Sequence, residues 1–278
     1  MDTVEVTLSV PILEHDRFIG WLDDRATGFR QTDAKLTAYV PADDWSEALR
    51  ERLEARLRAD GYLDALTLRL VADRNWNAAW EASVTPVRVG PFLLCRSTLD
   101  VPAEHDDATV LRIDPERSFG SGHHASTRLT LRLLIDAVAP DDTVVDVGIG
   151  TGVLAIAACH LGAHRVLGVD TEPAAVANAR ANVEHNGVAD RVTVREGSVD
   201  ALSPDVEADV LAANITLDTI LDLLPALRTR LAADGDLLLA GLLTSQRGRM
   251  LEGLAVHDLT AAQEASEDGW WAVRGRPA

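Results

Sequence analysis

The hydrophobic and polar positions change period along the chain, and the clearest succession lies between residues 144 and 170. A short β-branched apolar run is followed by closely spaced glycines and then by an Ala/Leu-rich stretch with helical periodicity. A second apolar run follows and ends at Asp170. This order predicts a strand, a tight turn, a helix and a second strand, which together form one βαβ unit.

The first 72 residues show the same two periods in another order. We expect a strand over 3–10, a helix over 12–24, strands near Phe29 and over 36–40, a helix over 43–61 and a strand over 63–72. Asp43 or Asp44 can cap the second helix. This succession is the split βαβ arrangement, so it predicts a small ferredoxin-like α+β domain. Because the region contains no nucleophile, metal cluster or cofactor loop, we expect it to recognise a substrate.

A linker and connecting region follows this domain. Three prolines interrupt its short β-rich runs. Trp76 and Trp80 are four residues apart and would share one helical face, and such pairs are more often packing anchors between domains than a ligand stack. The predicted division is a substrate-recognition domain over 1–73, the linker and connecting region over 74–113 and a catalytic domain over 114–278.

Helices and strands continue to alternate after the central unit. We expect a helix over 173–185, strands over 191–196 and 208–214, a helix over 218–231, a strand over 236–242, a helix over 245–254 and strands over 256–262 and 270–274. The last two strands follow each other without a helix. The pattern predicts a doubly wound α/β sheet of seven strands that ends in a β-hairpin.

The glycines of the central turn, Gly148, Gly150 and Gly152, have GxGxG spacing. Glycine lets the backbone approach a ligand closely, and the helix that follows offers unpaired N–H groups. Asp170 ends the second strand, where an acid can accept hydrogen bonds from ribose hydroxyls. These features predict a site for an adenosine-type cofactor.

The spacing of this turn distinguishes between two cofactors. A dinucleotide fingerprint needs a third glycine at the position that Val153 occupies. The chain instead places Asp146 before GxGxG, which is the form seen in S-adenosylmethionine-dependent methyltransferases. Seven strands with a terminal hairpin are also typical of that Rossmann-like sheet, whereas a dinucleotide-binding domain more often has six parallel strands.

A second glycine-rich loop, with Gly120 and Gly122, precedes a leucine-rich helix that begins near Thr127. His123 and His124 in this loop raise the question of a metal site. We reject it because the loop has no carboxylate or cysteine at ligand spacing, and adjacent side chains diverge. The two histidines are better explained as a hydrogen-bonding pair or as lid residues.

Composition limits the location and the partners. The 278 residues are 47% hydrophobic, yet we find no apolar run of membrane-spanning length and no charged-then-apolar leader, so we expect a soluble, cytoplasmic protein. Cys95 and Cys159 are far apart and are expected to be small buried hydrophobic residues. No heptad pattern or large apolar stripe demands a partner, so we expect a monomer.

The charge is strongly negative. Acids outnumber bases by 44 to 26, Lys35 is the only lysine, and the formal net charge is −18. Such a surface repels nucleic acid phosphates and anionic lipids, which disfavours direct binding to either. A salty cytoplasm and a basic protein substrate both explain it. We favour the first because the acids are spread along the whole chain.

The chemistry of methyl transfer needs few catalytic groups. The donor is already activated, so catalysis consists mainly of alignment and desolvation, and an amine acceptor must also be neutral. Asn214 ends a predicted strand above the glycine turn and can offer an oxygen to such an amine or bind the methionine part of the donor. The alternative role is to cap the next helix. The motif Asn-Pro-Pro-Tyr is absent after it, which argues against methylation of bases or of release factors.

The chain resembles the PrmA family, bacterial methyltransferases that modify amino groups of the ribosomal protein at the stalk base of the large subunit. The resemblance covers nearly the whole chain and is carried by SFGSGHHAST, VVDVGIGTGVLAIAACHLGAHRVLGVD, AANITLDTILDLLPAL and GWWAVRGR. It implies that Thr127, Gly148, Asp170 and Asn214 contact the cofactor. It also implies that the N-terminal domain holds the ribosomal protein and swings on the linker, and that lysine side chains and the N-terminal amine are trimethylated.

The chain departs from the family pattern at four positions, and the segment after Asn214 also lacks the family's usual proline. Ile149 replaces a cysteine, Ala125 replaces a frequent proline, and Gly197 and Ser198 stand where many methyltransferases carry an acid near the adenine. None of them removes a group that the chemistry needs. The alternatives are a related methyltransferase with another protein or small-molecule acceptor, a non-catalytic module that binds S-adenosylmethionine, and, last, a dehydrogenase.

Overall fold

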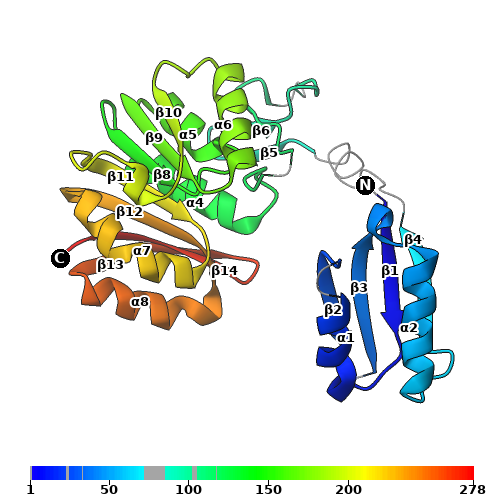
Figure 1. The fold of residues 1–278 in the computed structure, drawn as a ribbon. Coiled ribbons are helices and arrows are strands. Elements are labelled where there is room, and N and C mark those ends of the chain that lie inside the picture. Colours follow the sequence, from blue (N-terminus) through cyan, green and yellow to red (C-terminus); the bar gives the residue numbers. More distant parts are fainter. Residues whose placement is uncertain (1, 23–24, 33, 72–84, 102–104, 117) are drawn as a thin grey trace. The chain divides into compact units, whose positions relative to one another are not determined.

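The computed structural model describes residues 2–22, 25–32, 34–71, 85–101, 105–116 and 118–278. The chain forms two compact units, Met1–Trp80 and Glu81–Ala278 (Figure 1). Trp76 and Trp80 lie outside the described residues, so their predicted packing role stays a prediction. The architecture is mixed α/β, with one large and mostly parallel sheet in the second unit.

In its described residues, the first unit is a four-stranded antiparallel sheet with two α-helices. Its elements are β1 (Thr3–Leu8), a 3₁₀ turn η1 (Ile12–Glu14), α1 (His15–Leu22), β2 (Gly28–Thr32), β3 (Lys35–Pro41), η2 (Ala42–Asp44), α2 (Glu47–Ala59) and β4 (Leu66–Val71). The strand order is β2-β3-β1-β4. Alternate residues of β1, such as Val4 and Val6, are buried against helix residues that include Phe18 and Leu53.

The cap of α2 differs from the prediction. Asp43 and Asp44 lie in the preceding 3₁₀ turn, and the Oγ atom of Ser46 accepts the hydrogen bond from the Leu49 N–H at 3.2 Å. Trp45 is extended between the turn and the cap, which moves the start of the helix to Glu47. The extended backbone of Trp45 and Ser46 thus decides which polar side chain satisfies a free N–H group of the helix.

The second unit begins with a small three-stranded sheet. It contains β5 (Val87–Val89), β6 (Phe92–Cys95) and β7 (Thr109–Arg112) in that order. Strand β5 is antiparallel to β6, and β7 is parallel to it. Cys95 and Cys159 are buried and free, in agreement with the prediction that they are small core residues.

The large sheet has seven strands, and Figure 1 shows them in green to red. The elements are α4 (Ala125–Ala137), β8 (Thr143–Val147), α5 (Val153–Leu161), β9 (Arg165–Asp170), α6 (Pro173–His185), β10 (Val192–Glu196), β11 (Ala208–Asn214), α7 (Leu217–Arg230), β12 (Leu231–Leu243), α8 (Arg247–Val256), β13 (Leu259–Glu267) and β14 (Trp270–Pro277). The strand order is β10-β9-β8-β11-β12-β14-β13. All neighbours are parallel except at β14, which is antiparallel to both β12 and β13.

Successive residues of each strand point to opposite faces of the sheet, so the core of this unit has two parts, one on each face. Val144 faces the cluster that α4, α5 and α6 cover, whereas Val145 and Val147 face the cluster that α7 and α8 cover. Strands buried on both faces explain the nearly continuous apolar runs of the sequence. No helix among the described residues is long and apolar enough to span a bilayer.

The C-terminal strands differ from the prediction in position and length. Val256 ends α8 and does not begin a strand, and β13 starts three residues later, after a turn in which Asp258 has a φ of +52°. Both hairpin strands are longer than predicted, and β12 already starts at Leu231. The polar residues of β13 lie on an exposed face, so hydrophobic alternation does not mark this strand in the sequence.

Candidate functional site

A cavity of about 520 Å³ opens at the carboxyl ends of β8, β9 and β11. The chain reverses its direction of sheet growth between β8 and β11, and such switch points create ligand crevices in doubly wound sheets. Gly148, Gly150, Asp170 and Asn214 line this cavity. Gly152 and Thr127, the other two predicted site residues, are not among its lining residues.

The central turn requires glycine at the positions that face the cavity. Gly148 has a φ of +77° and Gly150 has a φ of +53°. A Cβ atom on Gly148 would lie 2.6 Å from the Ile215 side chain, and one on Gly150 would collide with the Phe119 carbonyl oxygen. The turn therefore combines a left-handed backbone with close packing, and only glycine tolerates both.

Asp170 already holds the turn in place. Its Oδ2 atom accepts the Gly150 N–H at 3.0 Å, and its Oδ1 atom accepts the Glu172 N–H at 3.0 Å. A carboxylate has about four acceptor positions, so two remain for a further partner. The side chain that the sequence predicted as a ribose ligand therefore also shapes the glycine turn.

Asp146 lies directly before this turn and is 1% exposed. Burial and then the charge of Asp170 raise the pKa of Asp146 to about 7, and the nearby Ala155 N–H offsets this only in part. Neither carboxylate oxygen has a hydrogen-bond partner among the described residues. A carboxyl group that is half ionised near neutral pH thus lies beside the cavity.

Asn214 and Thr127 contribute polar atoms without partners. The Asn214 Oδ1 and Thr127 Oγ1 atoms are shielded from solvent and accept or donate no hydrogen bond within the described residues. The capping role that the sequence allowed for Asn214 is wrong, because Thr216 occupies the N-cap position of α7. An unpaired buried polar atom is costly unless a ligand completes it. This observation fits a bound group better than an empty cavity.

A second pocket of about 220 Å³ shares Phe119 and Asn214 with the first and adds His124 and Trp270. The ring centroid of His124 lies 4.3 Å from that of Trp270 and 5.0 Å from that of Phe119. Burial, and then the charge of Arg128, lower the pKa of His124, which favours the neutral ring. The pocket therefore has an apolar, aromatic wall with one amide beside it.

His124 is also the N-cap of α4, where its Nδ1 atom accepts the Ser126 N–H at 3.2 Å. This fixes the ring as part of a helix start, whereas the predicted role of His123 and His124 as a hydrogen-bonding pair or as lid residues stays a prediction. The described residues contain no cluster of three or more His, Cys, Asp or Glu side chains that could hold a metal ion.

Sequence comparison places this geometry in a known family. The family model described as ribosomal protein L11 methyltransferase (PrmA) matches residues 5–277. The chain belongs to this family. A PrmA relative from Symbiobacterium thermophilum is 35% identical over 243 residues, which cover 86% of this chain and 79% of the relative. Another from Pelotomaculum thermopropionicum is 39% identical over 247 residues, with 87% and 79% covered.

A solved structure shares the fold of the PrmA chain. The ribosomal protein L11 methylase from Lactobacillus delbrueckii subsp. bulgaricus aligns with a TM-score of 0.65 at 28% identity, and the match covers 70% of this chain and 100% of that one. Together with the family match, this makes the protein a methyltransferase of the PrmA family.

The sequence analysis assigned no role to two residues of this chain that the structure brings to the site, Phe119 and Trp270. Phe119 is 51% exposed in a glycine-rich loop, and Trp270 lies 151 positions further on, at the start of β14. An aromatic residue among glycines was the only local signal for the first. The second becomes visible only when the terminal hairpin folds back beside α4, whose residues contact β14.

Proposed function

We propose that this protein transfers methyl groups from S-adenosylmethionine to amino groups of ribosomal protein L11, the protein of the stalk base of the large subunit. The acceptors we propose are lysine side chains and the N-terminal amine. The single observation that supports this best is the unpaired Oδ1 atom of Asn214, which two adjoining pockets share in a chain of the PrmA family.

The residues of the larger cavity suit the donor. The glycine turn leaves room for close approach, and Asp170 retains acceptor positions for ribose hydroxyls. Gly197 and Ser198 line the same cavity and would face the adenine in place of an acid. S-adenosylmethionine, when bound there, supplies a methyl group that a positively charged sulfur already activates. No metal takes part in this proposal.

The smaller pocket suits the acceptor. Phe119 and Trp270 exclude water around an incoming amine, and removal from water lowers the pKa of a lysine. The neutral nitrogen is the nucleophile. Asn214 can then accept a hydrogen bond from this nitrogen and direct its lone pair toward the larger cavity. The protein supplies alignment and desolvation, which is what methyl transfer requires.

The remaining features follow from the same proposal. The strand order β2-β3-β1-β4 supports a ferredoxin-like domain over 1–73 that recognises the ribosomal protein, and the seven-stranded order supports a Rossmann-like methyltransferase domain over 114–278. We infer a cytoplasmic monomer. The net charge of −18 disfavours nucleic acid as the acceptor.

The test is mass spectrometry of purified ribosomal protein L11 after incubation with this enzyme and S-adenosylmethionine. Mass gains in steps of one methyl, mapped to lysines or the N-terminus, are the expected result, and incubation without enzyme is the control. If calorimetry shows donor binding but L11 gains no mass, the acceptor is another molecule. If no protein from a ribosomal extract gains mass either, a non-catalytic binding module is the better account.

A further inference from the structure

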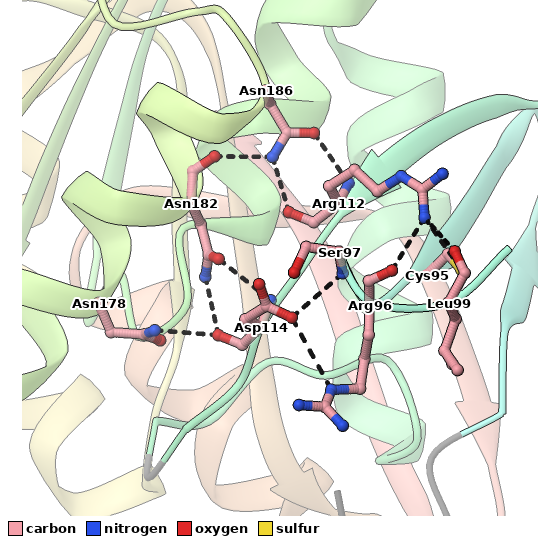
Figure 2. A network of polar contacts seen from close by, with 9 residues as sticks. All are labelled: Cys95, Arg96, Ser97, Leu99, Arg112, Asp114, Asn178, Asn182 and Asn186. Atoms are coloured by element: carbon pink, nitrogen blue, oxygen red, sulfur yellow. Dashed lines mark hydrogen bonds and ion pairs between the residues drawn. The ribbon is translucent and has the colours of Figure 1, made fainter. Parts of the chain in front are cut away.

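Helix α6 presents three asparagines at intervals of four residues, Asn178, Asn182 and Asn186, the last at its C-cap (Figure 2). Asparagine is a poor helix former because its side chain competes for backbone partners. Asn178 is 3% exposed and Asn182 is 2% exposed, so solvent does not satisfy their amides. Figure 2 shows their partners, which lie on the backbone of Arg112, the last residue of β7, and of Asp114, just after it.

Two of the asparagines hydrogen-bond to the backbone at the end of β7 in the way that a neighbouring strand would. Asn186 accepts the Arg112 N–H at 2.8 Å and donates to the Arg112 carbonyl at 2.7 Å. Asn182 does the same for Asp114, at 3.0 and 3.1 Å. Residues two apart in a strand are separated by about 6.7 Å, and residues four apart in a helix by about 6 Å. The two spacings match closely enough for successive amides to pair with alternate strand residues.

Asn182 makes one contact that the others lack. Its Nδ2 atom also donates to the Thr151 carbonyl, within the glycine turn, at 2.9 Å. Thr151 in turn makes two hydrogen bonds to the second glycine-rich loop, which contains Phe119 and Gly120. Its N–H donates to the Phe119 carbonyl at 2.9 Å, and its Oγ1 donates to the Gly120 carbonyl at 3.0 Å. Asn182 thus lies in a chain of bonds between the start of the loop at Asp114, the turn and Phe119.

The other side of the segment is held independently. Arg112 donates through Nη1 to the carbonyls of Arg96 and Leu99, and Asp114 accepts the Ser97 N–H at 3.1 Å (Figure 2). The segment 112–114 is therefore fixed without Asn182. The specific contribution of Asn182 is to tie this fixed segment to the glycine turn.

We propose that Asn182 is a positioning residue for methyl transfer, which holds the glycine turn and the Phe119 loop in one geometry around the donor and acceptor pockets. The inference rests on the proposed function of these pockets. Asn178 has a lesser part, because it donates one bond to the Asp114 carbonyl at 2.9 Å and its Oδ1 has no partner.

The chain offers a matched control in Asn186. Each of the two amides accepts one backbone N–H and donates to two backbone carbonyls, which for Asn186 are those of Arg112 and Asn182. Asn182→Asp and Asn186→Asp therefore make the same change in size, charge and lost bonds. They differ in two ways: only the first acts on the glycine turn, and Asn182 is 2% exposed whereas Asn186 is half-buried. The melting temperature therefore reports the added cost of a buried charge, and the donor Kd reports the effect on the turn.

The experiment measures S-adenosylmethionine affinity by calorimetry, kcat for L11 methylation and the melting temperature of both variants. We expect both melting temperatures to fall. In Asn182→Asp, the donor Kd should rise about tenfold or more and kcat should fall, whereas in Asn186→Asp both Kd and kcat should stay within about threefold of wild type. Equal effects of the two variants on Kd, or a wild-type Kd in Asn182→Asp, would overturn the proposal.

Two further outcomes are separable. If wild type binds the donor but leaves L11 unmethylated, the proposed acceptor fails, and the Kd comparison still decides the role of Asn182. A wild type without donor affinity overturns both the proposed function and the role of Asn182.

If Asn182→Asp does not fold, Thr151→Val provides a second test. It removes the hydrogen bond from Thr151 to the Gly120 carbonyl with little change in side-chain shape. It should raise the donor Kd by about threefold or more, and an unchanged Kd contradicts the proposal.

Discussion

At the scale of single residues, this site is marked by polar atoms that the fold leaves incomplete. The Oδ1 of Asn214, the Oγ1 of Thr127 and both oxygens of Asp146 are buried without partners in the described structure. Each costs about 1–3 kcal/mol relative to a satisfied group. Of these residues, Asn214 lines both pockets of the site and Asp146 directly precedes the glycine turn, so a bound ligand could offset the cost at Asn214.

Replacement of Asn214 by alanine should separate its two proposed contacts. If its oxygen accepts from the amine, kcat for L11 falls about 10- to 100-fold through lost alignment while the donor Kd stays within about threefold. If it binds the donor, the Kd rises as well. Steady-state kinetics and calorimetry distinguish the two results. Wild-type values of both would mean that Asn214 has neither role.

Asp170→Ala should weaken donor binding. The variant loses hydrogen bonds to a charged acceptor worth about 1.5–3 kcal/mol, which corresponds to a rise in Kd of about 10- to 100-fold. Asp209→Ala is the control, because Asp209 also accepts a backbone N–H, that of Thr143, but at the amino end of β11. Equal donor affinity in the two variants would place the ribose elsewhere.

Asp146 should give stability a distinct dependence on pH. Its pKa of about 7 in the folded protein exceeds the unfolded value of about 3.9, so the folded state binds more protons between pH 4 and 7. Its contribution to the free energy of unfolding therefore falls as pH rises through this window, by up to about 1.4 kcal/mol per unit, and is constant above it. The free energies of unfolding of wild type and Asp146→Asn, measured by urea denaturation, should therefore diverge with pH, and the variant should gain stability relative to wild type toward pH 8. Parallel profiles would contradict this.

At the scale of elements, the ends of helices and strands depend on contacts that sequence patterns mark poorly. The helix at 173–185 and the strand at 208–214 have their predicted bounds, because proline opens the helix and the strand is mostly apolar and buried. The start of α2 and the position of β13 do not. In both, non-helical or left-handed residues move the boundary.

The corrected cap of α2 can be tested directly. Ser46→Ala removes the acceptor of the Leu49 N–H and should reduce the free energy of unfolding of the N-terminal unit by about 1 kcal/mol. Asp43→Ala, the matched control at the predicted cap, should change it by less than about 0.5 kcal/mol. Chemical denaturation of the two variants provides the comparison. A larger loss of stability in Asp43→Ala than in Ser46→Ala would mean that the aspartate caps the helix.

At the scale of the whole molecule, both pockets of the site belong to one of the two units. All residues of the two site pockets lie in the unit 81–278, whereas the first unit has its own core. A chain that starts at residue 81 should therefore bind S-adenosylmethionine with a Kd within about threefold of the full chain.

The same truncated chain should methylate L11 at least about tenfold less efficiently in kcat/KM, because the contacts that we propose between the first unit and the ribosomal protein are lost. A short lysine peptide serves as the control substrate and should be methylated equally by both forms. Equal rates on L11 would mean that the first unit does not recognise this protein.

The sequence by itself determined the parts of this protein that depend on local rules. GxGxG between an apolar run and a helix pattern requires a left-handed turn, and Asp170 follows at the end of the next strand, so both could be located from neighbours in the chain. Resemblance to the PrmA family along the whole chain supplied the activity, and the family match over residues 5–277 confirms that assignment.

Tertiary structure alone decided the rest. That Asn214 has an unpaired oxygen, that the pKa of Asp146 is raised to about 7 and that Asn182 links Thr151 to Asp114 all depend on burial and on partners distant in sequence. Trp270 meets His124 because the terminal hairpin packs beside α4. Local propensity carries no information about such pairs, since their geometry exists only when the sheet order brings them together.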